Sequence, residues 1–145
     1  MNANTEILEY IYKDANMGAE SITTLIKTLQ SKDNKIKPVL EEELKKYEEY
    51  IKKSEKQLKK LKVELKEFST MAKMSSWMGI KMEMLKDNSD ARIADMLIKG
   101  LTVGTIDMNK KIDNYEKIVD KDILKLAKEF RSFQEDSIEK LKVYL

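Results

Sequence analysis

The sequence contains no histidine and no cysteine in 145 residues. These two residue types supply most transition-metal ligands, most general bases and most strong nucleophiles at neutral pH. Only carboxylates, lysines, tyrosines and hydroxyls are left for chemistry. The sequence therefore argues against an enzyme and predicts no cofactor.

Residues that interrupt helices are also scarce, with 4 glycines and 1 proline. Charged residues make up 37% of the chain and hydrophobic residues 41%. This composition is typical of long amphipathic helices and too apolar for a disordered chain. We expect one domain spanning residues 1–145, a length sufficient to close a single core.

Long hydrophobic runs are missing as well. No stretch approaches the roughly 18 uncharged apolar residues that a membrane-spanning helix needs. The first residues, MNANTE, lack the basic region and apolar run of a signal peptide. We expect no membrane association and a cytoplasmic protein.

The charge is nearly balanced, with 28 basic and 26 acidic residues and a net charge of +2. Only Arg92 and Arg131 are arginines. A nucleic-acid surface usually gathers cations on one face and uses arginine for bidentate contacts. Neither feature occurs here, so we expect no nucleic-acid partner.

Apolar residues recur at alternating spacings of three and four, which places them on one stripe of each helix. The pattern predicts helices over about residues 4–30, 38–67, 89–112 and 116–144. Asn4 or Thr5 is expected to cap the first helix, and Asn88 or Ser89 the third. Pro38 suits a first helical position. The stripe of the second helix is predicted to comprise Leu40, Leu44, Tyr47, Ile51, Ser54, Leu58, Leu61, Leu65 and Phe68.

The stretch from about residue 69 to residue 88 is rich in methionine and poor in charge. We expect a shorter helix that crosses from one end of the bundle to the other. Its side chains either fill the end of the core, as methionine does well, or form an exposed apolar patch that pairs two subunits or docks a partner. The residues of this possible interaction or dimer surface are Met71, Met74, Trp77, Met78 and Met82.

Short links join the first helix to the second and the third to the fourth. Such links produce two antiparallel hairpins, and the long connection between them produces a topology with one crossover. The sequence therefore predicts an all-α antiparallel four-helix bundle with one long, methionine-rich helical crossover between helices 2 and 3.

Two segments carry a family resemblance: MGAESI at residues 17–22, and ARIADMLIKG with the following VG at residues 91–100 and 103–104. With the order of the helices, they resemble the ferritin-like superfamily, and more particularly a bacterial branch of it. Iron-binding ferritin-like proteins carry an inward glutamate on each of two helices and Glu-x-x-His on the other two. The resemblance implies the ferritin-like fold.

The nearest counterparts of Glu-x-x-His are Glu48-x-x-Ile51 and Glu135-x-x-Ile138, with isoleucine where imidazole is required. At about 100° per residue, carboxylates at the family's candidate positions point away from the apolar stripes or lie at their edges. Those lying well off the stripes are Glu20, Glu48 and Glu135, and those nearer the edges are Glu43 and Asp107. We expect acidic side chains to face water and the interior to be apolar, without a di-metal centre.

Gly100 and Gly104 are unusual inside a helix, where each costs about 1 kcal/mol relative to alanine. Four residues apart on one face, they are expected to admit a neighbouring helix backbone at close range. Alternatively, they leave room for a small ligand or a partner helix.

These observations favour a non-catalytic helical-bundle protein with an interaction or scaffolding role, forming a homodimer or binding a protein partner. One alternative is a ferritin-like protein that binds iron or another metal with carboxylates alone. A further alternative is a carrier of a small apolar ligand between the hairpins.

Overall fold

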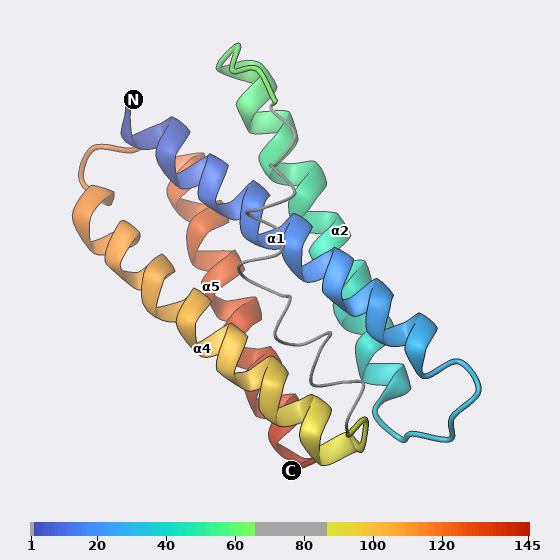
Figure 1. The fold of residues 1–145 in the computed structure, drawn as a ribbon. Coiled ribbons are helices and arrows are strands. Elements are labelled where there is room, and N and C mark those ends of the chain that lie inside the picture. Colours follow the sequence, from blue (N-terminus) through green and yellow to red (C-terminus); the bar gives the residue numbers. More distant parts are fainter. Residues whose placement is uncertain (1, 66–86) are drawn as a thin grey trace.

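The computed structural model describes residues 2–65 and 87–145 (Figure 1). Helices account for most of these residues, and this part of the chain contains no β-strand. The helices are α1 (Ala3–Thr28), α2 (Lys37–Lys60), α4 (Asp90–Tyr115) and α5 (Lys121–Lys142). The predicted all-α, four-helix architecture is confirmed at this level.

The helices form two antiparallel hairpins, α1 with α2 and α4 with α5, packed side by side (Figure 1). The end of α2 and the start of α4 lie at opposite ends of the bundle. None of the helices in the described ranges combines the length and hydrophobicity needed to cross a membrane.

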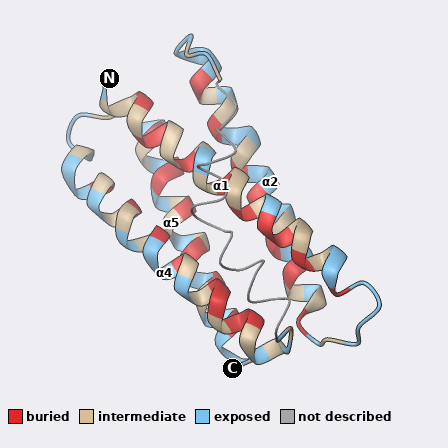
Figure 2. Cartoon of the chain, in the orientation of Figure 1, coloured by how far each residue is buried: buried red, intermediate tan, exposed pale blue. Residues whose placement is uncertain are grey.

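Buried side chains line the inner faces of the helices, whereas exposed residues cover the outside (Figure 2). The spacing of apolar residues predicts a stripe on the third helix that is buried except for the half-buried Gly100; it comprises Ile93, Leu97, Gly100, Leu101, Gly104, Met108 and Ile112. Removing apolar surface from water stabilises the fold by about 25 cal/mol per Å². The largest fully buried side chains are Phe130, Ile7, Leu8, Ile11, Leu25, Leu29, Ile36, Leu40, Leu58, Ile93, Met108 and Ile112.

Helix α1 begins and ends slightly earlier than predicted, and neither Asn4 nor Thr5 is its cap. The Asn2 side chain caps the helix instead, accepting a hydrogen bond from the Thr5 amide at 2.9 Å. Asn4 Oδ1 accepts from the Asp120 amide at 2.9 Å, which ties the start of α1 to the link before α5.

Helix α2 ends at Lys60, not near residue 67 as the stripe predicted. Lys62 adopts a left-handed backbone conformation with φ of 58°. The amide of Lys62 then bonds the Lys59 carbonyl, and that of Val63 the Leu58 carbonyl, which closes the helix. The spacing of apolar residues does not predict that a lysine will adopt the left-handed conformation that ends a helix. Leu61 and Leu65 therefore lie beyond the helix, and Phe68 lies outside the described residues.

The ends of the second hairpin also differ from the prediction. Ser89 caps α4 by accepting from the Arg92 amide at 3.3 Å, as one of the two predicted caps. The helix continues to Tyr115 rather than residue 112. Helix α5 begins at Lys121 rather than residue 116, because residues 116–119 form a turn in which the Ile118 and Val119 amides bond the Tyr115 carbonyl.

Polar contacts join the two hairpins at both ends of the bundle. At one end the Asp90 carboxylate accepts from the amides of Lys35 and Ile36, at 3.0 and 3.5 Å, and from Asn34 Nδ2 at 2.9 Å. At the other end the Tyr115 hydroxyl donates to the Glu6 carboxylate. These contacts join the hairpins at their ends, and further hydrogen bonds join them between the ends.

Candidate functional site

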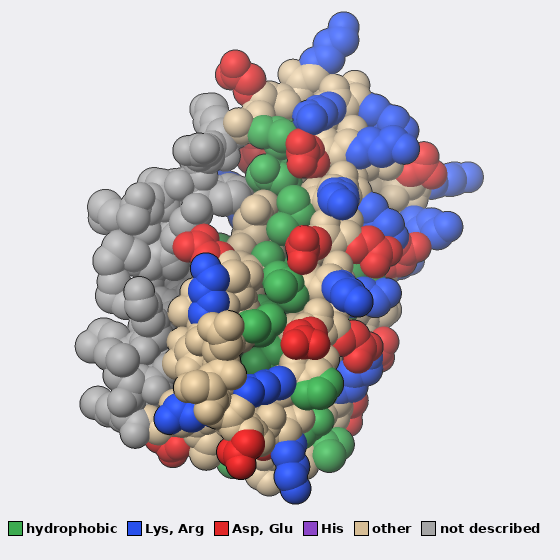
Figure 3. Space-filling view, turned by 90° about the vertical axis from the view of Figure 1, so that its right-hand side faces the viewer, with side chains coloured by type: hydrophobic (Ala, Val, Ile, Leu, Met, Phe, Trp, Pro, Cys, Tyr) green, Lys and Arg blue, Asp and Glu red, His purple; other side chains and the backbone are tan. Residues whose placement is uncertain are grey.

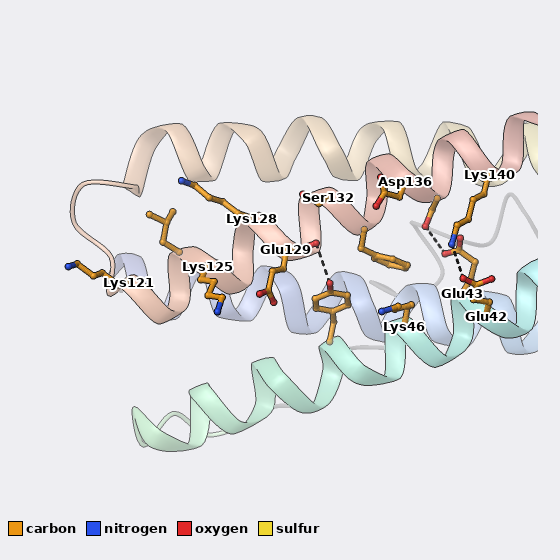
Figure 4. Close-up of a pocket in the computed structure, with 14 residues that line it drawn as sticks. Glu42, Glu43, Lys46, Lys121, Lys125, Lys128, Glu129, Ser132, Asp136 and Lys140 are labelled. Carbon is orange, nitrogen blue, oxygen red and sulfur yellow. Dashed lines mark hydrogen bonds and ion pairs between the residues drawn. The ribbon is translucent and has the colours of Figure 1, made fainter.

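A groove of about 660 Å³ runs between α2 and α5 (Figure 4). Its floor contains Tyr50 from α2 and Phe133 from α5, and Leu124 also lines it. Lysines and carboxylates from both helices form its rims. A smaller hollow of about 260 Å³ extends the groove, because Lys125 and Glu129 line both.

The floor is held by aromatic packing and one hydrogen bond. The Tyr50 ring lies 5.1 Å from Phe130 and 5.4 Å from Phe133, centroid to centroid. The Tyr50 hydroxyl donates to the Glu129 carbonyl at 3.2 Å (Figure 4). Burial, followed by the charge of Glu129, raises the pKa of Tyr50 to about 12. Tyr50 is therefore a neutral, fixed part of the groove wall.

Glu43 lies inside the groove with only 5% of its surface exposed. Its Oε2 accepts a hydrogen bond from Ser137 Oγ at 2.8 Å. Burial raises its pKa to about 7, although the Ser137 bond acts in the opposite direction. The expectation that Glu43 faces water is wrong, because α2 buries Glu43 and Tyr50 while Leu44 and Ile51 are half-buried.

The rims differ in how their charges are paired. Glu42 binds Lys140 across the groove at 2.7 Å (Figure 4). Lys53 lies 3.9 Å from Glu129. On α5, Figure 4 shows Lys125 pointing toward α2, whereas Lys121 points outward at the start of the helix and Lys128 points away from α2.

A second polar cluster lies between α1, α4 and α5. Asp14 Oδ2 accepts from Gln134 Nε2 at 2.9 Å, and the Tyr10 hydroxyl donates to the Gly104 carbonyl at 3.3 Å. Burial, followed by the charge of Asp107, raises the pKa of Asp14 to about 7. The expected purely apolar interior is therefore wrong at Asp14 and Gln134, the latter only 1% exposed.

The sequence predicted that a neighbouring helix backbone would approach Gly104 closely. The groups nearest to it are instead side chains. A Cβ there would lie 2.6 Å from Gln134 Nε2 and 3.5 Å from Asp14 Oδ2. Gly100, the other member of the predicted pair, is half-buried on the same helix. Gly104 thus makes room for the Asp14–Gln134 hydrogen bond.

The carboxylates predicted to face away from the apolar stripes do so, since Glu20, Glu48 and Glu135 are exposed. Asp107 is half-buried. Within residues 2–65 and 87–145, no three carboxylates come together in a group able to hold a metal ion. The predicted interaction residues Met71, Met74, Trp77, Met78 and Met82 lie outside the described residues.

Heptad spacing gives a signal for the buried Gln134 and the partly buried Asp14, which the apolar stripes omit. Asp14 lies seven residues after Ile7, and Gln134 seven after Ala127, so each shares a helix face with a buried apolar residue. Glu43 and Tyr50 are likewise seven apart. The polarity of Asp14, Glu43 and Gln134 argued against their burial, whereas their spacing favoured it.

The outer surface shows no large region of one charge sign on the face seen in Figure 3. A column of hydrophobic side chains runs down this face between interspersed basic and acidic side chains.

Comparison of the chain with protein-family models, curated proteins and solved structures gave no match. The proposed function therefore rests on the geometry of the groove.

Proposed function

We propose that this protein is a non-catalytic interaction module that binds a helical segment of a partner protein between α2 and α5. The observation that carries this proposal is the groove itself, with its aromatic floor and charged rims. Leu124 and Phe133 are only partly buried, so they offer apolar surface to an incoming side chain. An apolar floor with a polar rim is the usual arrangement of a protein-binding site.

The shape of the groove favours a helix as the bound element. Two neighbouring helices form its walls, and the smaller hollow beside Gln57 and Leu126 lengthens it. A third helix packs well into such a groove, because side-chain ridges fit between those of the two walls. Amphipathic helices bind in this way through apolar residues spaced by three and four.

We also propose the ferritin-like topology with a long crossover, supported by the position of the α2 end and the α4 start at opposite ends of the bundle. Homodimerisation through the methionine-rich segment and a cytoplasmic location stay predictions. A carboxylate-only metal site and a small apolar ligand are the competing functions.

The binding proposal can be tested by calorimetric titration with an amphipathic helical peptide whose polar face is uncharged. Ser132 lines the groove and is exposed, so Ser132→Trp should fill the groove and abolish binding. Thr102→Trp, on the exposed face of α4, is the matched control and should bind like the wild type. Equal binding by both variants would contradict the proposed site.

A further inference from the structure

The carboxylates that line the groove are each engaged with a nearby group. Glu42 pairs with Lys140, Glu129 lies near Lys53, and Glu43 holds Ser137. Asp136 lies close enough to Lys140 to help raise the pKa of that lysine. Glu42, Glu129 and Asp136 thus each lie near a lysine, whereas Glu43 bonds the neutral Ser137 hydroxyl.

Three lysines of the groove form no ion pair with a carboxylate of the described residues. Lys121, Lys125 and Lys128 are exposed and line the groove from α5. Spacings of four and three residues place them on one side of this helix. Within the part of the chain that the structure describes, none of the three forms an ion pair, unlike Lys46, which lies 3.7 Å from Glu49.

We propose that the partner helix is acidic on its polar face and places its carboxylates against Lys121, Lys125 and Lys128. This inference rests on the proposed function, since it specifies the chemistry of the segment bound in the groove. The apolar face of the helix contacts Phe133, and its acidic face lies toward the three lysines. Charge complementarity at a rim chiefly sets the choice of partner and the association rate.

The test uses three synthetic helical peptides with one shared apolar face and a polar face of glutamate, glutamine or lysine. Binding to the full-length protein is measured by calorimetry at low and at high salt. The glutamate peptide should bind roughly tenfold more tightly than the glutamine peptide at low salt, since each exposed pair contributes little alone. The lysine peptide should bind most weakly, and salt should reduce the differences.

A charge-reversal pair locates the effect on the protein. Lys125→Glu combined with Lys128→Glu should remove or reverse the preference for the glutamate peptide. Lys110→Glu, at an exposed position of α4 outside the groove, should leave it unchanged. Circular dichroism of each variant checks that all are equally folded.

The possible outcomes separate the two proposals. Equal, groove-dependent binding of all three peptides would overturn the acidic partner and leave the helix-binding function intact. Failure of all three to bind would overturn both. Binding of the protein to phosphatidylserine vesicles, without preference among the peptides, would assign the lysines to an anionic membrane surface instead.

Discussion

At the scale of single residues, Asp14 is the most consequential departure from an apolar interior. Its pKa is about 7 in the folded protein because burial disfavours the charged carboxylate. In an unfolded chain an aspartate titrates near pH 4. As the pH rises, the unfolded state therefore loses its proton first, and folding stability falls between about pH 4 and about pH 7.

Replacing Asp14 with asparagine removes this penalty while keeping an oxygen that accepts the hydrogen bond from Gln134. Asp14→Asn should weaken the loss of stability between about pH 5 and about pH 8, by up to about 1.4 kcal/mol per pKa unit removed. Urea denaturation at both pH values measures this difference. Glu48→Gln, at an exposed carboxylate, is the control and should keep the wild-type pH dependence. An unchanged pH dependence in Asp14→Asn would contradict the role given to burial.

Position 18 requires glycine because the Tyr47 ring packs directly against it. A Cβ at this position would lie 2.5 Å from two carbons of the Tyr47 ring, and Phe133 packs edge-on against the same ring at 5.1 Å. Gly18→Ala should therefore lower the free energy of unfolding by about 1–3 kcal/mol despite the better helix propensity of alanine. Thermal or urea denaturation provides the measurement.

A double-mutant cycle identifies the source of that loss. In a Tyr47→Leu background the aromatic ring is absent, so Gly18→Ala should cost much less than in the wild type. The same cost in both backgrounds would show that the ring is not what excludes a side chain at residue 18.

At the scale of helices, the cap of α2 makes a direct prediction. Lys62 adopts a left-handed conformation that glycine accepts more readily than any residue with a Cβ. Lys62→Gly should raise the thermal midpoint, with a gain of up to about 1 kcal/mol. Lys60→Gly, within the last turn of the helix, should instead lower it. If both substitutions destabilise equally, the helix does not end at Lys60.

The helices show how far sequence periodicity reaches. The buried stripe of α4 was predictable because its apolar residues keep a regular spacing, and the Ser89 cap follows from residue type. The end of α2 was not predictable, since apolar residues continue past Lys60 while a lysine forms the left-handed cap. On α2, the predicted stripe included Leu44 and Ile51 because they are hydrophobic. That choice placed Glu43 outside the buried face, whereas the structure buries it.

At the scale of the whole molecule, the separation of α2 from α5 could not be read from the sequence. Periodicity identifies which face of a helix is buried, but not how far two hairpins stand apart. Contacts of Asp90 and Glu6 join the hairpins at their ends, and hydrogen bonds of Tyr50 and Glu43 join α2 to α5 between them. Between those ends, Tyr50 and Phe133 form a floor while lysines and carboxylates keep the rims in water.

An open groove in the free protein is the claim on which both proposals depend. A soluble paramagnetic probe, read by NMR on selectively labelled leucine and phenylalanine, tests it directly. The signals of Leu124 and Phe133, which line the groove, should broaden strongly, while those of fully buried Phe130 should not. Protection of Leu124 and Phe133 equal to that of Phe130 would show that α2 and α5 close over the floor, and would contradict the account.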